Sequence, residues 1–192
     1  MTMLVYIDSC AWNYLHDNSI DLERELPSSD FAIYVTREVE VELGTIPDVG
    51  KDGLDRTSLK NYIKINIDRR PVKTSYTFGF QTMGPDGDPS PIQVYGGFDV
   101  GAWQSPEERD FYDNSEIIQQ LKSGKRNSGL GKNQTDASLA SKSFSSIILT
   151  NELANSPGPL KFAAALGGKV VYLSSQVKSS GLTIGEYLKS VF

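Results

Sequence analysis

A chain of 192 residues, 39% hydrophobic and 22% charged, is large enough to bury a core and has the composition of a soluble globular protein. It contains no apolar run of about 18 residues that would span a membrane, and its single cysteine excludes a disulfide framework and a multi-cysteine zinc site. The net charge of −5 argues against a surface coated with nucleic-acid-binding cations, and we expect a cytoplasmic protein.

In chain order, the first expected elements are a strand at Met3–Ile7, a helix at Cys10–Leu15 capped by Ser9, a strand at Phe31–Val35, a helix at Arg37–Leu43 capped by Thr36, and a helix within Leu54–Ile67. The later ones are helical structure from Ser105-Pro106 to Leu121 with a break near Asp113, a helix at Thr135–Phe144, a strand at Ser146–Leu149, a helix at Leu160–Leu166, a strand at Lys169–Leu173 and a helix at Ile184–Val191. Strands that alternate with helices predict an α/β fold with a mostly parallel sheet.

Residues 77–104 interrupt this alternation. They include six glycines, three prolines and five aromatic residues, and Asp86-Gly87 is typical of a turn. A disordered segment would have fewer aromatic residues. We therefore expect an ordered insertion, built as a hairpin with long loops, within a single domain of residues 1–192.

Four acidic residues occupy positions where a site can form. Asp8 follows the first strand, at the end of the sheet where α/β proteins collect ligands. Glu42 borders the apolar stripe of its helix, and Asp136 lies in the first turn of a later one. Glu152 follows another strand by way of Thr150-Asn151. Each has a plainer explanation: a helix cap for Asp8, a solvated edge for Glu42, the helix dipole for Asp136, and a simple turn for Glu152.

Three segments together resemble the PIN-domain family of ribonucleases. They are Leu4–Trp12, with its strand, Asp8 and small hydroxylated residue; Val35-Thr36 followed by Glu42-Leu43; and Asp136–Ala140 followed by the strand that leads to Glu152. The family usually has an aspartate where this chain has Glu152, and the segment between Glu42 and Asp136 is longer than in compact toxin members. The resemblance implies a three-layer α/β/α fold around the parallel sheet.

The resemblance also implies a metal-dependent endoribonuclease, with RNA as substrate and Mg²⁺ or Mn²⁺ held by Asp8, Glu42, Asp136 and Glu152. Hard cations of this kind prefer carboxylate and water oxygens. Thr150, Ser9 and Asn151 would support the ligands through hydrogen bonds, and Lys125, Arg126 and Lys132 would hold the RNA backbone. Toxins of toxin–antitoxin pairs are small members of the family, so an antitoxin protein and a homodimer are possible partners. Tyr95, Phe98 or Trp103 of the insertion are candidates for stacking on RNA bases.

Two other functions fit parts of this pattern. A PIN-like module that has lost catalysis and only binds nucleic acid or protein is one, because Glu152 departs from the family. A haloacid-dehalogenase-like phosphotransferase is the other, although its nucleophile is normally followed two residues later by a second aspartate, where this chain has Cys10. Cys10 itself lacks a credible base and is expected to be a buried thiol. A second basic stretch, Arg69, Arg70 and Lys73, is either a phosphate contact or a solvated surface.

Overall fold

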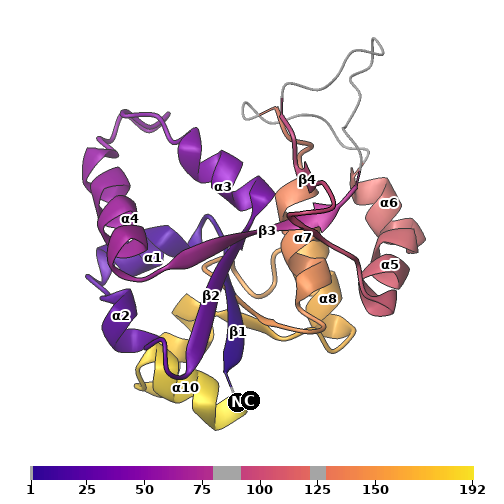
Figure 1. The fold of residues 1–192 in the computed structure, drawn as a ribbon. Helices are drawn as coiled ribbons and strands as arrows, with labels where there is room; N and C mark the ends of the chain where they lie inside the picture. Colours follow the sequence, from indigo (N-terminus) through magenta and orange to yellow (C-terminus); the bar gives the residue numbers. More distant parts are fainter. Residues whose placement is uncertain (1, 80–91, 122–128) are drawn as a thin grey trace.

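The computed structural model describes residues 2–79, 92–121 and 129–192 (Figure 1). The strands are β1 (Met3–Ile7), β2 (Phe31–Thr36), β3 (Val72–Phe78), β4 (Tyr95–Gly96), β5 (Gly101–Ala102), β6 (Ile147–Thr150) and β7 (Val170–Tyr172). The helices are α1 (Ala11–Asp17), α2 (Leu22–Glu25), α3 (Arg37–Gly44), α4 (Thr57–Arg69), α5 (Pro106–Asp113), α6 (Ser115–Leu121), α7 (Gln134–Lys142), α8 (Pro159–Ala165), the π-helix η1 (Leu173–Val177), α9 (Lys178–Ser180) and α10 (Ile184–Val191).

The described strands form one sheet in the order β4-β3-β2-β1-β6-β7, and β5 pairs with β3 beside this path. Every pairing is parallel. The central strands β1 and β6 are apolar along most of their length because helices cover both faces of the sheet. The predicted α/β fold, with helices flanking a mostly parallel sheet in three layers, is confirmed.

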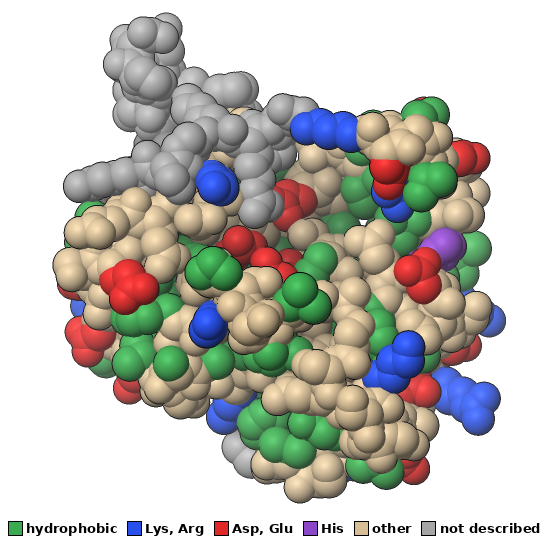
Figure 2. All heavy atoms as spheres, turned by 180° about the vertical axis from the view of Figure 1, so that it is seen from behind, with side chains coloured by type: hydrophobic (Ala, Val, Ile, Leu, Met, Phe, Trp, Pro, Cys, Tyr) green, Lys and Arg blue, Asp and Glu red, His purple; other side chains and the backbone are tan. Residues whose placement is uncertain are grey.

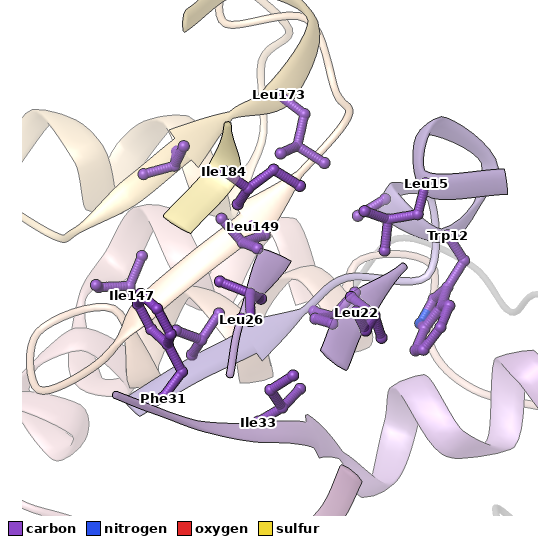
Figure 3. Close-up of a cluster of buried hydrophobic side chains, with 14 of the residues drawn as sticks. Trp12, Leu15, Leu22, Leu26, Phe31, Ile33, Ile147, Leu149, Leu173 and Ile184 are labelled. Carbon is purple, nitrogen blue, oxygen red and sulfur yellow. The ribbon is translucent and has the colours of Figure 1, made fainter. Parts of the chain in front are cut away.

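Each face of the sheet has its own hydrophobic core. Val5 and Ile7 point to the face covered by α1, α2, α4 and α10, whereas Tyr6, between them, belongs to the face covered by α5, α6, α7 and α8. Figure 1 shows these two groups of helices on opposite sides of the strands. In Figure 3, labelled side chains of β2 and β6 converge on the first face with Trp12 and Leu15 of α1, Leu22 of α2 and Ile184 of α10.

The strand order creates a crevice at one edge of the sheet. From β1 the chain moves outward through β2 and β3, and it later returns to add β6 on the other side of β1. Strands β1 and β6 are therefore neighbours whose following segments leave in opposite directions, which in open α/β sheets is where ligands bind. Asp8 follows β1 directly, and Thr150 is the last residue of β6.

The insertion differs from its prediction. Thr77 and Phe78 belong to β3, and the described segments after it pair with β3 as the parallel strands β4 and β5. A hairpin requires antiparallel neighbours, so the hairpin prediction is wrong for the described residues. The predicted turn at Asp86-Gly87 lies outside the described residues.

Across the described ranges, no helix combines the length and apolarity that crossing a membrane requires.

Candidate functional site

Asp8 is a buried carboxylate at the centre of the crevice. Its side chain is 2% exposed, and its backbone N–H donates to the Leu149 carbonyl at 2.9 Å, which fixes the residue to the adjacent strand. The Thr150 hydroxyl donates to Asp8 Oδ2 at 2.7 Å. Strand pairing between β1 and β6 thus fixes the position of the carboxylate, and the last residue of β6 orients it.

Cys10 completes the hydrogen bonds around this carboxylate. Its thiol donates to Asp8 Oδ2 at 2.9 Å and lies 3.3 Å from Thr150 Oγ1, and the Asn151 N–H donates to its sulfur at 3.2 Å. Burial raises the pKa of the Cys10 thiol, and the negative charge of Asp8 raises it further. The thiol is half-buried and protonated, so it serves as a donor to Asp8 and is a poor nucleophile.

Glu42 reaches the same place from helix α3. Thr36 caps this helix as predicted, because its hydroxyl accepts the Val39 N–H at 3.4 Å. One oxygen of Glu42 accepts the Ser9 hydroxyl at 2.7 Å, and the other accepts the Thr135 hydroxyl at 2.8 Å. The prediction that Ser9 caps α1 is wrong: Cys10 occupies the cap position without a side-chain hydrogen bond, and the Ser9 hydroxyl donates to Glu42 instead.

The charges of this cluster favour a hard cation. Burial raises the pKa of Asp8 and the charge of Glu42 raises it further, against the hydrogen bonds from Cys10 and Thr150, which lower it. In the described part of the chain, the hydrogen bonds that reach Asp8 all come from neutral groups. A buried carboxylate near a second one is costly unless a positive charge offsets the repulsion. Carboxylate oxygens are ligands that Mg²⁺ and Mn²⁺ prefer, and Asp8 and Glu42 supply two carboxylates here.

Asp136 and Glu152 arrive at the same edge through their neighbours. Asp136 is half-buried in the first turn of α7, one residue after the Thr135 that donates to Glu42. The Glu152 N–H donates to Thr150 Oγ1 at 3.1 Å, and its charge helps burial to raise the pKa of Tyr172 at the end of β7. Within residues 2–79, 92–121 and 129–192, no three His, Cys, Asp or Glu side chains form a group that could hold a metal ion by themselves. Mg²⁺ commonly uses one or two carboxylates and takes its other ligands from water and substrate phosphate.

The remaining predicted site residues are Asn151, a supporting residue, and three basic residues expected to contact RNA. Asn151 accepts a hydrogen bond from Ser174 through its Oδ1 and reaches the site through its backbone N–H, so it is a structural neighbour of the carboxylates. Lys132 is exposed in the turn before α7, whereas Lys125 and Arg126 lie outside the described residues.

The second basic stretch is far from the crevice. Arg70 is 3% exposed and donates to the carbonyls of Leu26 and Phe31, so it holds the chain between α4 and β3. It precedes β3, at the amino ends of the strands. The acidic cluster lies at their carboxyl ends, so the possibility that Arg70 contacts a phosphate at this site is excluded.

Glu38 is a site residue that the sequence interpretation missed. Its carboxylate accepts the Ser138 hydroxyl at 2.9 Å, and burial raises its pKa. Glu38 precedes Glu42 by four residues, and Ser138 follows Thr135 by three, so each pair repeats at helical spacing. The spacing can be seen in the sequence, but only the packing of α3 on α7 shows that each glutamate accepts a hydrogen bond from one of the two hydroxyl groups.

No protein-family model, curated protein or solved structure matches this chain. The site can therefore be classified only from its own geometry. It is a carboxylate cluster at the switch point of a parallel sheet, held by hydroxyl groups from several elements. Figure 2 shows acidic side chains gathered in a hollow of the molecular surface.

Proposed function

We propose that this chain is a metal-dependent endoribonuclease of the PIN-like kind, which hydrolyses RNA phosphodiester bonds with Mg²⁺ or Mn²⁺. The observation that carries the proposal is the buried Asp8 beside the Glu42 carboxylate at the crevice between β1 and β6. Two like charges at a ligand-binding edge, with neutral donors around them, favour a divalent cation as the third charge. Such a cation, when bound, supplies Lewis acidity toward a phosphate and a water molecule.

The protein side chains would then bind, orient and accept protons. Asp8 and Asp136 are the proposed central ligands, and Glu152 completes the set. Glu42 binds the ion or orients the attacking water, whose proton one of its oxygens can accept. The Ser9 and Thr135 hydroxyls hold the two Glu42 oxygens at 2.7 and 2.8 Å, so this carboxylate is oriented before substrate arrives.

RNA is the proposed substrate because basic residues that can contact phosphates precede Asp136 in the chain. Lys132 is exposed and lies four residues before Asp136, and Lys125 and Arg126 precede it in the chain. A few cations that are close in sequence can attract a polyanion even when the net charge is −5. An antitoxin-type inhibitor and a homodimer are further partners that the family resemblance implies.

The geometry is less suited to a phosphotransferase that uses Asp8 as its nucleophile. Such a nucleophile needs a carboxylate oxygen open to a phosphoryl group. Asp8 is 2% exposed, and its Oδ2 accepts hydrogen bonds from both Cys10 and Thr150. A metal cation is smaller than a phosphoryl group, and Asp8 Oδ1, which receives neither of these two bonds and accepts the Ser9 hydroxyl at 3.4 Å, is the oxygen that we assign to the ion.

The test is cleavage of a mixture of single-stranded RNA and transfer RNA in Mn²⁺, Mg²⁺ or EDTA. We compare the wild type with the double variant Asp8→Asn/Asp136→Asn, and with Asp110→Asn, an exposed acid of α5, as the matched control. We expect cleavage that needs the metal, is lost in the double variant and is unchanged in the control. Thr135→Val, which removes only the hydroxyl bound to Glu42, should lower the rate about 10- to 100-fold.

Two results would contradict the proposal. Cleavage that persists in EDTA or in the double variant would come from another site or another protein. The second result is a folded chain that binds RNA, cleaves none of it and shows no change in melting temperature with Mn²⁺. This would indicate the binding module that has lost catalysis.

A further inference from the structure

A second polar pocket lies one helical turn along α3 from Glu42. It has a volume of about 470 Å³, within the usual range for small-molecule sites, and it opens between α3, β3, β4, α5 and α7. Its polar lining comes from Glu38, Thr77, Tyr95, Gln104, Tyr112 and Gln134. Figure 1 shows α3, β4, α6 and α7 around this part of the molecule. The lining residues are distinct from Asp8, Glu42, Asp136 and Glu152.

The Glu38 carboxylate is the charged group of this pocket. Its Oε2 accepts the Ser138 hydroxyl at 2.9 Å. Tyr95 and Tyr112 line the same pocket as Glu38. Burial raises the pKa of both phenol groups, and the charge of Glu38 raises it further. The pocket thus combines one carboxylate with two aromatic rings, the set of groups that recognises a flat ligand rich in N–H donors.

The amides add donors at the same pocket. The Gln134 Oε1 accepts the Gly131 N–H at 2.9 Å, which leaves the NH₂ group of this side chain to donate. Gln104 contributes a second amide to the lining. A ligand that fits would therefore present N–H donors to Glu38, an acceptor to an amide and a flat face to tyrosine.

We propose that this pocket binds an unpaired guanine base of the RNA, next to the phosphate that is cleaved. Guanine is the base whose Watson–Crick edge offers two adjacent N–H donors, N1–H and the N2 amino group, to one carboxylate. Its O6 accepts from an amide, and its ring stacks on an aromatic side chain, as unpaired RNA bases commonly do. Adenine and cytosine present one amino donor, and uracil one imino donor, on that edge.

The position of the pocket relative to the carboxylates agrees with this role. Glu38 and Glu42 are four residues apart in α3, so they are separated by roughly 6 Å along the helix axis. This is comparable with the length of one nucleotide in a single strand. Helix α7 holds both acids, through Ser138 and Thr135. The inference rests on the proposed function, because it assigns the base beside the phosphate which that site would cleave.

The test measures binding without catalysis. Guanosine, adenosine, cytidine and uridine 5′-monophosphates are titrated in EDTA, by calorimetry or NMR, into the wild type, Glu38→Gln and Glu40→Gln. Glu40 lies on the same helix and pairs with Arg37, so it is the matched control. We expect the guanine nucleotide to bind about 10-fold more tightly than the others, and this preference to be lost in Glu38→Gln alone. Tyr95→Ala, at a residue that is 44% exposed, should weaken the binding of all four nucleotides.

The outcomes separate this inference from the nuclease proposal. Equal affinity for the four nucleotides in the wild type, or a guanine preference that survives in Glu38→Gln, would overturn the guanine pocket. Mapping the cut sites in RNA gives the second readout. Metal-dependent cuts with no guanine bias would reject the pocket and keep the nuclease. Guanine binding that depends on Glu38, in a chain that cleaves no RNA, would keep the pocket and reject the nuclease.

Discussion

The buried ion pair between Lys142 and Glu108 allows a direct test of how charge contributes to the stability of the fold. Lys142 Nζ lies 2.9 Å from Glu108 Oε2, and the two side chains are 9% and 7% exposed. The pair joins α7, which carries Thr135 and Ser138, to α5. The positive charge of Lys142 also acts on Glu38, whose pKa it lowers against the effect of burial. Lys142 is therefore the ion-pair partner of Glu108 and has a smaller effect on Glu38, after those of burial and of the hydrogen bonds from Ser138 and Thr36, so removing the lysine should cost more than removing Glu108.

The expected costs follow from distance and burial. At 2.9 Å the Coulomb attraction is about 6 kcal/mol at an effective dielectric constant near 20. Removing one partner of a buried pair typically costs about 3–5 kcal/mol. We expect Lys142→Met to fall near 5 kcal/mol, because Glu108 and Glu38 both lose their counter-charge. Glu108→Gln should fall at or below about 3 kcal/mol, because the charge of Lys142 still acts favourably on Glu38.

Urea unfolding at pH 7 measures these differences in the free energy of unfolding. In the double variant Glu108→Gln/Lys142→Met, one of the two uncompensated carboxylates is gone. We therefore expect it to be more stable than Lys142→Met alone. Equal costs for the two single variants, or costs under about 1 kcal/mol for both, would refute the view that this cation serves two buried acids.

Three further predictions concern stability. Burial raises the pKa of Asp8 above its usual 3.8, so the protein loses stability as pH rises through the raised value. Asp8→Asn should therefore stabilise the metal-free protein by roughly 0.5–2 kcal/mol at pH 7, and should have no such effect below pH 3.8. Mn²⁺ should raise the melting temperature of the wild type and leave that of the variant unchanged. Leu15→Ala, at a fully buried core residue, should cost about 2–5 kcal/mol in urea unfolding, whereas Leu166→Ala, at a 55% exposed residue, should cost under about 0.5 kcal/mol. Gly185→Ala should reduce the free energy of unfolding by about 1–3 kcal/mol and lower the melting temperature, because the added Cβ would lie 2.3 Å from the Glu25 carbonyl oxygen. An unchanged melting temperature would show that α10 can shift to make room for the methyl group.

Local chemistry explains what the sequence predicted well. Strand β1 ends as expected because an apolar run stops at Asp8, and α3 begins as expected because Thr36 is a good N-cap. Strand β3 was missed because Lys73, Thr74 and Ser75 make it half polar, as suits a strand flanked at its far end by the two-residue strands β4 and β5.

Site contacts that join distant parts of the chain could not be read from local patterns. The Ser9–Glu42 bond spans 33 residues, and the Ser138–Glu38 bond spans 100. Each depends on how α3 meets β1 or α7 in three dimensions. A serine that follows a strand looks like a helix cap in sequence, and only the packed fold shows that Ser9 instead donates to a carboxylate.

The position of β6 also affects when the site can form during synthesis. The Thr150 hydroxyl that orients Asp8 is 142 residues further along the chain, which corresponds to roughly 7 to 28 seconds of translation at 5–20 residues per second. Until β6 emerges from the ribosome, β1 lacks one of its two neighbours and Asp8 lacks this hydroxyl partner. A nascent chain therefore acquires the hydrogen bond that orients Asp8 only after β6 has been synthesised.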